Sequence, residues 1–337
     1  MSVDSVPATG QSALLKKAAL VGYLPLAIFV VLLIYLSFTA PNYFSFQSLD
    51  LILRQAIPTV VVCLGLSVVV MAGGNDVVSG GIDLSIPATA VLSAAIIADQ
   101  VTNHGTPIAI AIVMALIAAL AVGAANALLV VRIGMTPLLA TLSSSVAVVG
   151  IVKVITSSRR INVDHPAVVW LRDGSFAGVS VGVILTAVLF LIYFFFVHRT
   201  RWGMNLQAVG GSRDAAEISG IPTGRFLSQS FIVAAFAGGL ASMFVLARGS
   251  GSTPGTEENL LLEMVLATFL GAAFSPRRVV TLWGAVLGAV LVTALSIGFK
   301  SIGVNVFWTG CIKGALILIV VASASLSLKA SARGHSG

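Results

Sequence analysis

The stretch that decides the fold is residues 107–131, which read PIAIAIVMALIAALAVGAANALLVV and contain no charged side chain. A helix needs about 20 mostly apolar residues to cross the hydrocarbon core of a bilayer, so this run predicts a transmembrane helix. The whole chain has the same character, because 58% of its 337 residues are hydrophobic and only 9% are charged. Soluble domains carry about a quarter of their residues as charged side chains. The composition therefore indicates an integral membrane protein.

Nine further apolar runs accompany this one along the chain. The ten candidate spans have the ranges 20–40, 56–72, 84–98, 107–131, 137–156, 179–197, 227–247, 260–274, 280–299 and 306–327. The run at 20–40 is longer than the apolar part of a cleavable signal peptide, so we interpret it as the first membrane helix. The sequence thus predicts an all-α integral membrane protein with about ten transmembrane helices in one membrane domain, residues 19–328.

The basic residues favour one orientation of these spans. Membrane proteins keep an excess of Lys and Arg in the loops that face the cytoplasm. If the N-terminus is inside, the inside segments hold 11 basic residues and the outside segments hold 7. We therefore expect cytoplasmic tails at 1–18 and 329–337 and a cytoplasmic loop at 198–226. Contact with anionic lipid headgroups then explains the net charge of +7, with no need for a nucleic-acid partner.

Glycines and polar residues separate the second and third runs. Residues 73–85 read GGNDVVSGGIDLS, which predicts a broken or re-entrant segment. Non-helical backbone in a membrane survives only where protein or a wet cavity surrounds it, and broken helices in transporters often present their ends to the solute. Asp83 and Ser85 are also residue types that cap a helix, so a capping role and contact with a solute both stay open.

The loop at 198–226 contains a second short helix signal. Residues 208–222 read AVGGSRDAAEISGIP, with a Ser/Asp-rich start, a helix-forming middle and a Gly-Ile-Pro stop. This pattern predicts one helix of about two or three turns, which is too short to be stable alone. We expect it to pack against the membrane domain or against a partner.

Four stretches carry a resemblance to a known class of transporter. The segment HRTRWGMNLQAVGGSRDAAEISGIP at 198–222, SGGIDLS at 79–85, the block NALLV…TPLLATL at 126–142 and the tail at 263–320 follow one another in order. Together they resemble the permeases of ABC importers of the ribose/xylose/autoinducer-2 class, over nearly the whole chain. The chain departs from that class at Ser212, where the class has Asn, and at SPRR (275–278), which replaces a Gly-rich turn.

The resemblance implies a function and a set of partners. The chain would be the membrane permease subunit of an importer in a bacterial inner membrane, translocating a sugar or sugar-like solute. Its partners would be a second permease copy or a paralogue, two copies of a cytoplasmic ABC ATPase, and a periplasmic binding protein that delivers the solute. ATP and Mg²⁺ would be held by the ATPase, so we expect no cofactor and no metal in this chain.

The resemblance also makes the predicted helix at 208–222 a coupling helix, which passes the movement of the ATPases to the membrane domain. The residues assigned to this contact are Gly210, Gly211, Asp214, Ala215, Ala216, Glu217, Ser219, Gly220 and Ile221. Small side chains let such a helix seat closely in a groove, and acidic residues near its start suit the helix dipole. An ordinary amphipathic cytoplasmic linker is the alternative.

Few polar residues fall in or beside the predicted spans, and they are candidates for the solute pathway. The candidates are Asn75, Asp83, Ser85, Asn126 and Thr141. Asn126 also suits hydrogen bonding between helices. Glu263 and Lys313 are ionisable groups within spans, where burial of a charge is costly, so we expect them to pair across two helices. The alternative for Lys313 is a hydrogen bond to backbone carbonyls.

Other functions find less support in the sequence. No phosphate-binding GxxxxGK[ST] loop occurs, and no set of catalytic or metal-ligating residues can be assembled, so we do not expect an enzyme. An ion-coupled secondary transporter is an alternative, but it needs titratable groups in mid-span, where only Glu263 qualifies. Permeases for nucleosides or branched-chain amino acids remain alternatives within the class. The sequence names neither the solute nor the type of dimer.

Overall fold

The structure, a computed structural model, describes residues 25–74, 80–275 and 277–335. The predicted N-terminal tail at 1–18 and Asn75 of the predicted solute pathway lie outside the described residues. The helices are Pro25–Thr39, α2 (Phe46–Gly73), α3 (Ile86–Thr102), α4 (Ile108–Ala127) with its π-helical continuation η1 (Leu128–Arg132), α5 (Pro137–Thr156), α6 (Pro166–Asp173), α7 (Val181–Arg199), α8 (Arg201–Gly211), α9 (Arg213–Ile218), α10 (Thr223–Gly249), α11 (Thr256–Ala272), α12 (Leu282–Ser301) and α13 (Val306–His335). The prediction of an all-α membrane protein is confirmed.

Six of the described helices are long and apolar enough to cross a membrane. They are α2, α4 with η1, α5, α7, α10 and α12. Three shorter apolar stretches, Pro25–Thr39, Ile86–Thr102 and Phe307–Val320, fall at the positions of other expected spans. Helix α11 falls at the position of the remaining expected span, 260–274, but it carries three acidic residues, Glu257, Glu258 and Glu263. The count of about ten transmembrane helices therefore stays a prediction.

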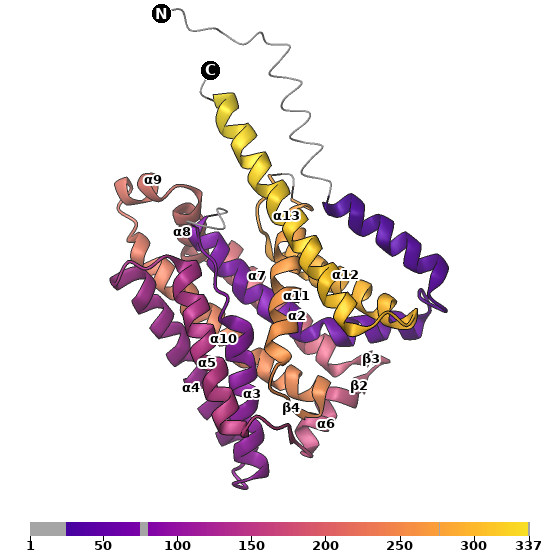
Figure 1. Ribbon diagram of the computed structural model, residues 1–337. Helices are drawn as coiled ribbons and strands as arrows, with labels where there is room; N and C mark the ends of the chain where they lie inside the picture. Colours follow the sequence, from indigo (N-terminus) through magenta and orange to yellow (C-terminus); the bar gives the residue numbers. More distant parts are fainter. Residues whose placement is uncertain (1–24, 75–79, 276, 336–337) are drawn as a thin grey trace, which may run out of the picture.

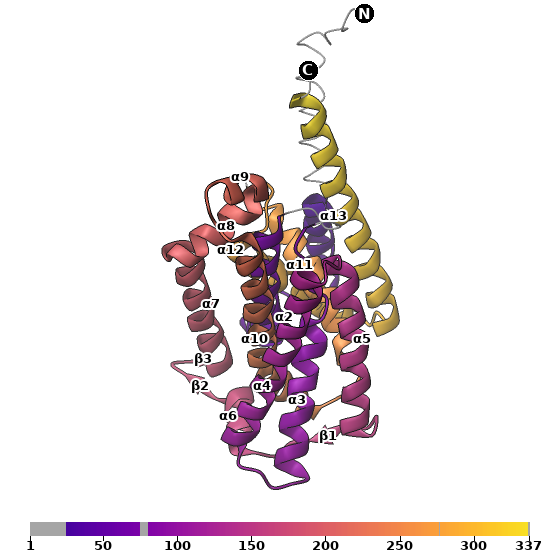
Figure 2. The same cartoon turned by 90° about the vertical axis from the view of Figure 1, so that its left-hand side faces the viewer.

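Two helices form the centre of the bundle. In α2, 89% of the most apolar stretch is buried inside the protein, and in α10 the share is 72%, whereas in α4 and α5 it is only 22%. Helix α2 lies against α10, α12, α11, α7 and α8, while α3 lies against α10, α4 and α5. Figure 2 shows α7 and α5 on opposite sides, with α2 and α10 between them. The exposed apolar faces of the outer helices suit contact with lipid or with another membrane subunit.

Small residues allow the closest helix contact of the C-terminal half. The GAVLG pattern at 284–288 in α12 faces α11, and a Cβ placed on Gly288 would collide with the carbonyl oxygen of Ala267. A Cβ on Gly284 would likewise collide with the carbonyl group of Gly271. The two backbones therefore touch directly, which is the packing that small residues at a four-residue spacing favour between membrane helices.

The two ends of the bundle carry different short elements (Figure 1). At one end, α8 and α9 form a short helical pair, and the C-terminal end of α13 points the same way. The opposite end carries α6 and two small antiparallel sheets. In these sheets, β1 (Ile161–Asn162) pairs with β4 (Gly251–Ser252), and β2 (Ser175–Phe176) pairs with β3 (Val179–Ser180).

Candidate coupling segment and polar interior

The segment predicted as one helix over 208–222 is two helices, so that prediction is wrong in its boundaries. Helix α8 already begins at Arg201, where the hydroxyl of Thr200 accepts a hydrogen bond from the Gly203 amide at 3.2 Å. The chain turns at Ser212, whose backbone is extended (φ −159°, ψ 109°) and whose hydroxyl accepts from the Ala215 amide at 3.3 Å. Ser212 thereby ends α8 and caps α9, because a side-chain oxygen that satisfies an exposed amide favours a new helix start.

Helix α8 is fixed directly to the end of α2. Leu206 and Val209 are buried in a cluster with Leu64, Val68 and Ala72 of α2. At Gly210 the two backbones touch, since a Cβ at this position would collide with the carbonyl oxygen of Met71. Next to it, a Cβ on Gly211 would meet no atom within 4 Å. The first predicted coupling glycine is therefore a packing contact between α8 and α2, and the second faces open space.

Helix α9 projects from this base and leaves most of its surface free. Ala216 is buried, whereas Asp214, Ala215 and Ser219 are exposed. Ile218, a large apolar side chain, is 89% exposed. Small residues around one exposed apolar side chain form a surface that suits a groove on another protein.

A hydrogen-bonded strap holds α9 against the start of α10. Thr223 donates its hydroxyl hydrogen to Glu217 Oε1 at 2.6 Å, and Arg213 Nε donates to the same oxygen at 3.3 Å. These hydrogen bonds, from Thr223 first and then from Arg213, hold the pKa of the Glu217 carboxyl below its usual value. Gly220, with φ +77°, makes the turn between the two partners. The strap fixes the orientation of α9 relative to α10.

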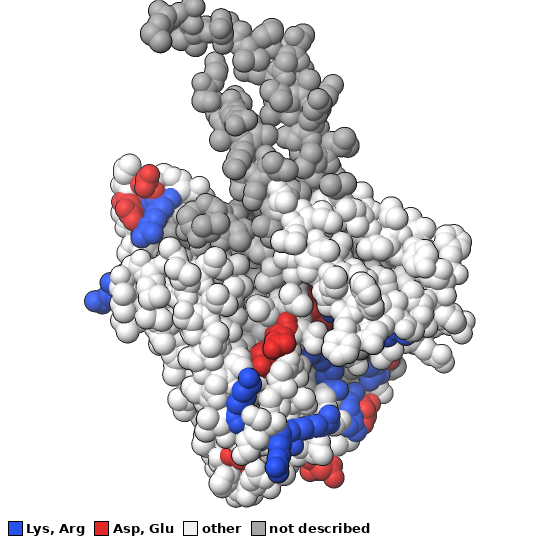
Figure 3. Space-filling model, in the orientation of Figure 1, with Lys and Arg blue, Asp and Glu red and all other residues white. Residues whose placement is uncertain are grey.

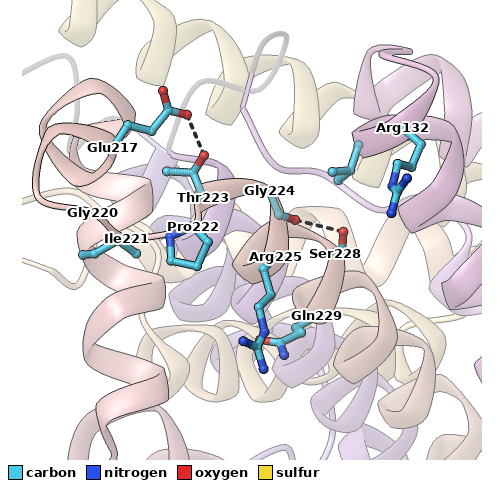
Figure 4. A pocket seen from close by; sticks show the side chains of 11 residues that line it. Arg132, Glu217, Gly220, Ile221, Pro222, Thr223, Gly224, Arg225, Ser228 and Gln229 are labelled. Carbon is cyan, nitrogen blue, oxygen red and sulfur yellow. Dashed lines mark hydrogen bonds between the residues drawn. The ribbon is translucent and has the colours of Figure 1, made fainter.

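Beside this strap lies an open cleft of about 770 Å³ (Figure 4). It lies between the start of α10, the 217–222 turn and η1, and two basic side chains reach it, Arg132 and Arg225. Ser228 donates to the carbonyl oxygen of Gly224 at 2.9 Å along the same wall. The predicted residues Glu217, Gly220 and Ile221 line the cleft, while Arg132, Thr223 and Arg225 were not singled out from the sequence.

A second candidate region is polar and fully buried, where the non-helical segment Gly80–Ser85 meets α4 and α5. Asp83 Oδ1 accepts hydrogen bonds from the Ser85 amide at 2.8 Å and from its hydroxyl at 2.6 Å. Asn126 Nδ2 of α4 donates to Ser85 Oγ at 2.7 Å. Thr141 Oγ1 of α5 accepts from the Leu84 amide at 3.1 Å. Four of the five predicted pathway residues thus form one network.

This network ties three helices together, and two of its oxygens have no hydrogen-bond partner among the described residues. These are Asp83 Oδ2 and Asn126 Oδ1. Ser85 stands at the N-cap of α3, but its hydroxyl donates to Asp83 and makes no capping bond to α3. Asp83 therefore orients Ser85. The expected capping of α3 by the Ser85 side chain is not observed. Whether this region touches a solute stays a prediction.

The two ionisable residues predicted to pair lie in contact. Lys313 Nζ of α13 is 2.8 Å from Glu263 Oε1 of α11, and both side chains are largely buried. Thr59 of α2 donates to the other carboxylate oxygen, Glu263 Oε2, at 2.8 Å. One carboxylate therefore joins α2, α11 and α13. Thr59 was missed at the sequence level, because a threonine in an apolar run gives no sign of its partner.

Comparisons with known proteins agree with this architecture. Residues 48–321 match the family described as "Branched-chain amino acid transport system / permease component". The chain is 27% identical to the galactose/methyl galactoside import permease protein of Escherichia coli, over 94% of this chain and 98% of the relative. It is 27% identical to the ribose import permease protein of Bacillus subtilis, over 86% of this chain and 88% of the relative. A probable ABC transporter permease protein of Sinorhizobium fredii is 30% identical over 87% of this chain and 85% of the relative.

No solved structure matches the chain. The family match nevertheless covers the central helices, the α8–α9 segment and the Glu263–Lys313 pair, and it agrees with the resemblance that the sequence motifs carry. The chain is a multi-pass membrane protein that belongs to the family of permease components of transport systems of the branched-chain amino acid type.

Proposed function

We propose that this chain is the permease subunit of an ATP-driven importer for a sugar or a sugar-like solute. The observation that carries the proposal is that relatives matching nearly the whole chain are named as import permeases for ribose and for galactose. An arabinose ABC transporter permease protein of Azospirillum brasilense, 26% identical over 87% of the chain, points the same way. These names favour a sugar over an amino acid or a nucleoside, although the family description names amino acids.

The same proposal sets the orientation and the partners. The α8–α9 end would face the cytoplasm of a bacterial inner membrane, with both termini on that side and about ten helices crossing the bilayer. A second copy or a paralogue would complete the pathway, two cytoplasmic ATPases would bind ATP with Mg²⁺, and a periplasmic binding protein would dock at the α6 end. Exposed arginines at that end, including Arg159 and Arg160, suit an acidic docking surface.

The contacts of α8 and α9 suggest how ATP hydrolysis moves the membrane domain. An ATPase that holds the exposed face of α9 would displace α8, because α9 is joined to it at Ser212 and fixed to α10 by Glu217. Since α8 touches α2 backbone to backbone at Gly210, α2 would move with it. Helix α2 reaches Glu263 through Thr59, so displacement at one end would act on the buried ion pair farther along the bundle.

Reconstitution tests this function. The chain, its cognate ATPase and its binding protein are placed in liposomes with radiolabelled ribose, galactose or arabinose outside and ATP inside. We expect accumulation of at least one sugar that stops when the ATPase, the binding protein or ATP is omitted. A proton or sodium gradient applied to the chain alone should drive none, and accumulation under that condition would favour the secondary transporter instead.

A further inference from the structure

A cavity with charged walls lies at the end opposite α8 and α9. It has a volume of about 810 Å³ and is enclosed by the first turns of α2, the end of α10, and parts of α11, α12 and α13. The buried Glu263–Lys313 pair forms part of its wall. Figure 3 shows most of the Lys and Arg side chains of this face over its lower part, toward the same end of the bundle, and others near α9. In the proposed orientation, this end of the bundle lies on the side from which a solute would be delivered.

The wall of this cavity carries more positive than negative charge. Its charged residues are Arg248, Lys300, Lys313 and Glu263, which is three basic groups against one carboxylate, a formal excess of +2. Glu263 pairs with Lys313 and also attracts Arg248, so its single negative charge leaves two positive charges of this wall in excess. Arg248 donates only to the backbone carbonyl of Gln55, at 3.4 Å, and neither side chain forms an ion pair with any described carboxylate.

An excess of positive charge beside a membrane cavity is costly unless something balances it. The energy of a charge falls when an opposite charge or an anionic ligand comes within hydrogen-bond distance, and charge-assisted hydrogen bonds are about twice as strong as neutral ones. Arg248 is only partly exposed, so it keeps incomplete contact with water. An anionic group between Arg248 and Lys300 would supply the missing balance.

The rest of the wall suits a ligand with many hydroxyl groups. Side-chain hydroxyls from three elements line it, including Thr253, Thr293, Ser296 and Thr309. Thr293 is 5% exposed, and its Oγ1 has no hydrogen-bond partner among the described residues. A buried hydroxyl without a partner costs free energy, so it favours a ligand that can bond to it. Among the described residues, no aromatic side chain lines the cavity, so none of them offers a flat surface for a sugar ring to stack on.

We propose that this cavity binds a polyhydroxylated anion, such as a sugar acid or a sugar phosphate, with Arg248 and Lys300 holding its carboxylate or phosphate. The hydroxyl-bearing side chains hold the hydroxyl groups of the ligand. The inference rests on the proposed import function and narrows its solute to an acidic sugar derivative, in contrast to the neutral sugars in the names of the relatives.

Calorimetric titration of the full-length chain in phosphatidylcholine nanodiscs tests this site with two matched pairs of probes. D-gluconate is compared with D-glucitol, and D-ribose 5-phosphate with D-ribose, since each pair differs mainly in the anionic group. We expect at least one anion to bind at least tenfold more tightly than its neutral partner. The preference should weaken at 0.5 M salt, because salt screens a partly exposed charge.

The double variant Arg248→Gln/Lys300→Gln should lose this preference. The matched control Lys153→Gln/Arg159→Gln removes two exposed positive charges outside the cavity wall and should keep it. Both variants are compared with the original chain by circular dichroism and size-exclusion chromatography. A cavity variant that fails to fold is replaced by Lys300→Gln alone, whose exposed side chain is expected to be tolerated, and which should still reduce the preference.

Four results would overturn the proposal: equal binding of anion and neutral partner, an unchanged preference in a folded cavity variant, an equal loss in the control variant, or loss of gluconate binding when the nanodiscs contain phosphatidylglycerol. The last would assign the cavity to an anionic lipid headgroup. None of these four results would contradict the import function, which is tested by ATP-driven sugar uptake in reconstituted liposomes. Failure of that uptake, with anion binding intact, would reject the import function instead.

Discussion

The two ends of the bundle are built from opposite chemistry. At the α8–α9 end, glycines bring backbones into contact, and among the described residues an exposed ion pair joins Arg213 and Glu217. At the other end, the cavity wall combines a buried ion pair, two further cations and a group of hydroxyls. Close packing of small groups transmits displacement, whereas fixed charges and hydroxyls bind polar solutes. The difference fits the proposal that the α8–α9 end transmits movement and that the opposite end binds the solute.

The largest effect is expected at the buried ion pair. Lys313→Met leaves the Glu263 carboxylate without its counter-charge, and removal of one partner of a buried pair costs about 3–5 kcal/mol. The double variant Glu263→Gln/Lys313→Met should recover most of this loss, because neither of the two positions then carries a charge opposite a neutral partner. The measurement is the free energy of unfolding from SDS titration followed by circular dichroism. A single variant as stable as the original chain would show that the pair is open to water.

The next effect is expected at the contact between α8 and α2. Gly210→Ala forces a methyl group onto the Met71 carbonyl oxygen, and overpacking of this kind costs about 1–3 kcal/mol. Gly211→Ala is the matched control, since it adds the same methyl group in open space. In reconstituted liposomes we expect Gly210→Ala to reduce ATP-driven uptake at least tenfold and Gly211→Ala to leave it within twofold. Equal uptake by the two variants would remove the α8–α2 contact from the transmission path.

Much of the peripheral fold follows from the sequence. Helix α5 spans Pro137–Thr156, the same limits as its apolar run, because proline suits the first turn of a helix and Ser157 ends it in a left-handed conformation. Helix α2 begins ten residues before the predicted 56, at Phe46, since Ser45 caps it and Asp50 pairs with Arg54 one turn later. The polar residues of the stretch 46–55 kept this segment from being predicted as part of a span. The hydrogen bonds and the ion pair that they form are known only from the structure.

The candidate site was predictable in its residues but not in its partners. Glu263 and Lys313 stood out because ionisable groups are rare in apolar runs. Asn126 stood out as a polar amide in such a run. Thr59, Thr223 and Arg248 gave no signal, because their roles depend on residues that are distant in the sequence or on a cavity that the fold creates. The break at Ser212 was also missed, because the Ala-Ala-Glu stretch that follows it predicts a helix, whereas the two glycines before it conceal the end of α8.

A smaller effect is expected in the buried polar network. Asn126→Ala removes the hydrogen bond from Nδ2 to Ser85 Oγ and should reduce the free energy of unfolding by about 1 kcal/mol. Asn126→Asp keeps an acceptor but removes the donor and places a second carboxyl near Asp83, so we expect it to destabilise more than alanine does. The measurement is again SDS titration. If alanine were the more damaging substitution, filling of space would outweigh hydrogen bonding at this position.

The smallest effect is expected at the strap of α9. The folded state holds the pKa of Glu217 below its ordinary value of about 4.3, so the strap stabilises α9 above that pH. This stability is lost as the pH falls through the lowered pKa of the folded state. We expect limited proteolysis at 212–222 to increase below about pH 4, and Glu217→Gln to show weak dependence on pH over the same range. An identical pH profile in both proteins would mean that another group controls the segment.

The central claim, that an ATPase acts on this chain through α9, is most directly tested by site-specific cross-linking in the assembled transporter. Cysteine is placed at the exposed Ser219 or at the exposed Phe176 of the opposite end, with the exposed Cys311 replaced by serine. The account predicts that Ser219→Cys cross-links to the ATPase and loses ATP-driven uptake, while Phe176→Cys forms no such product. Cross-linking of the ATPase to Phe176→Cys, with none to Ser219→Cys, would contradict it.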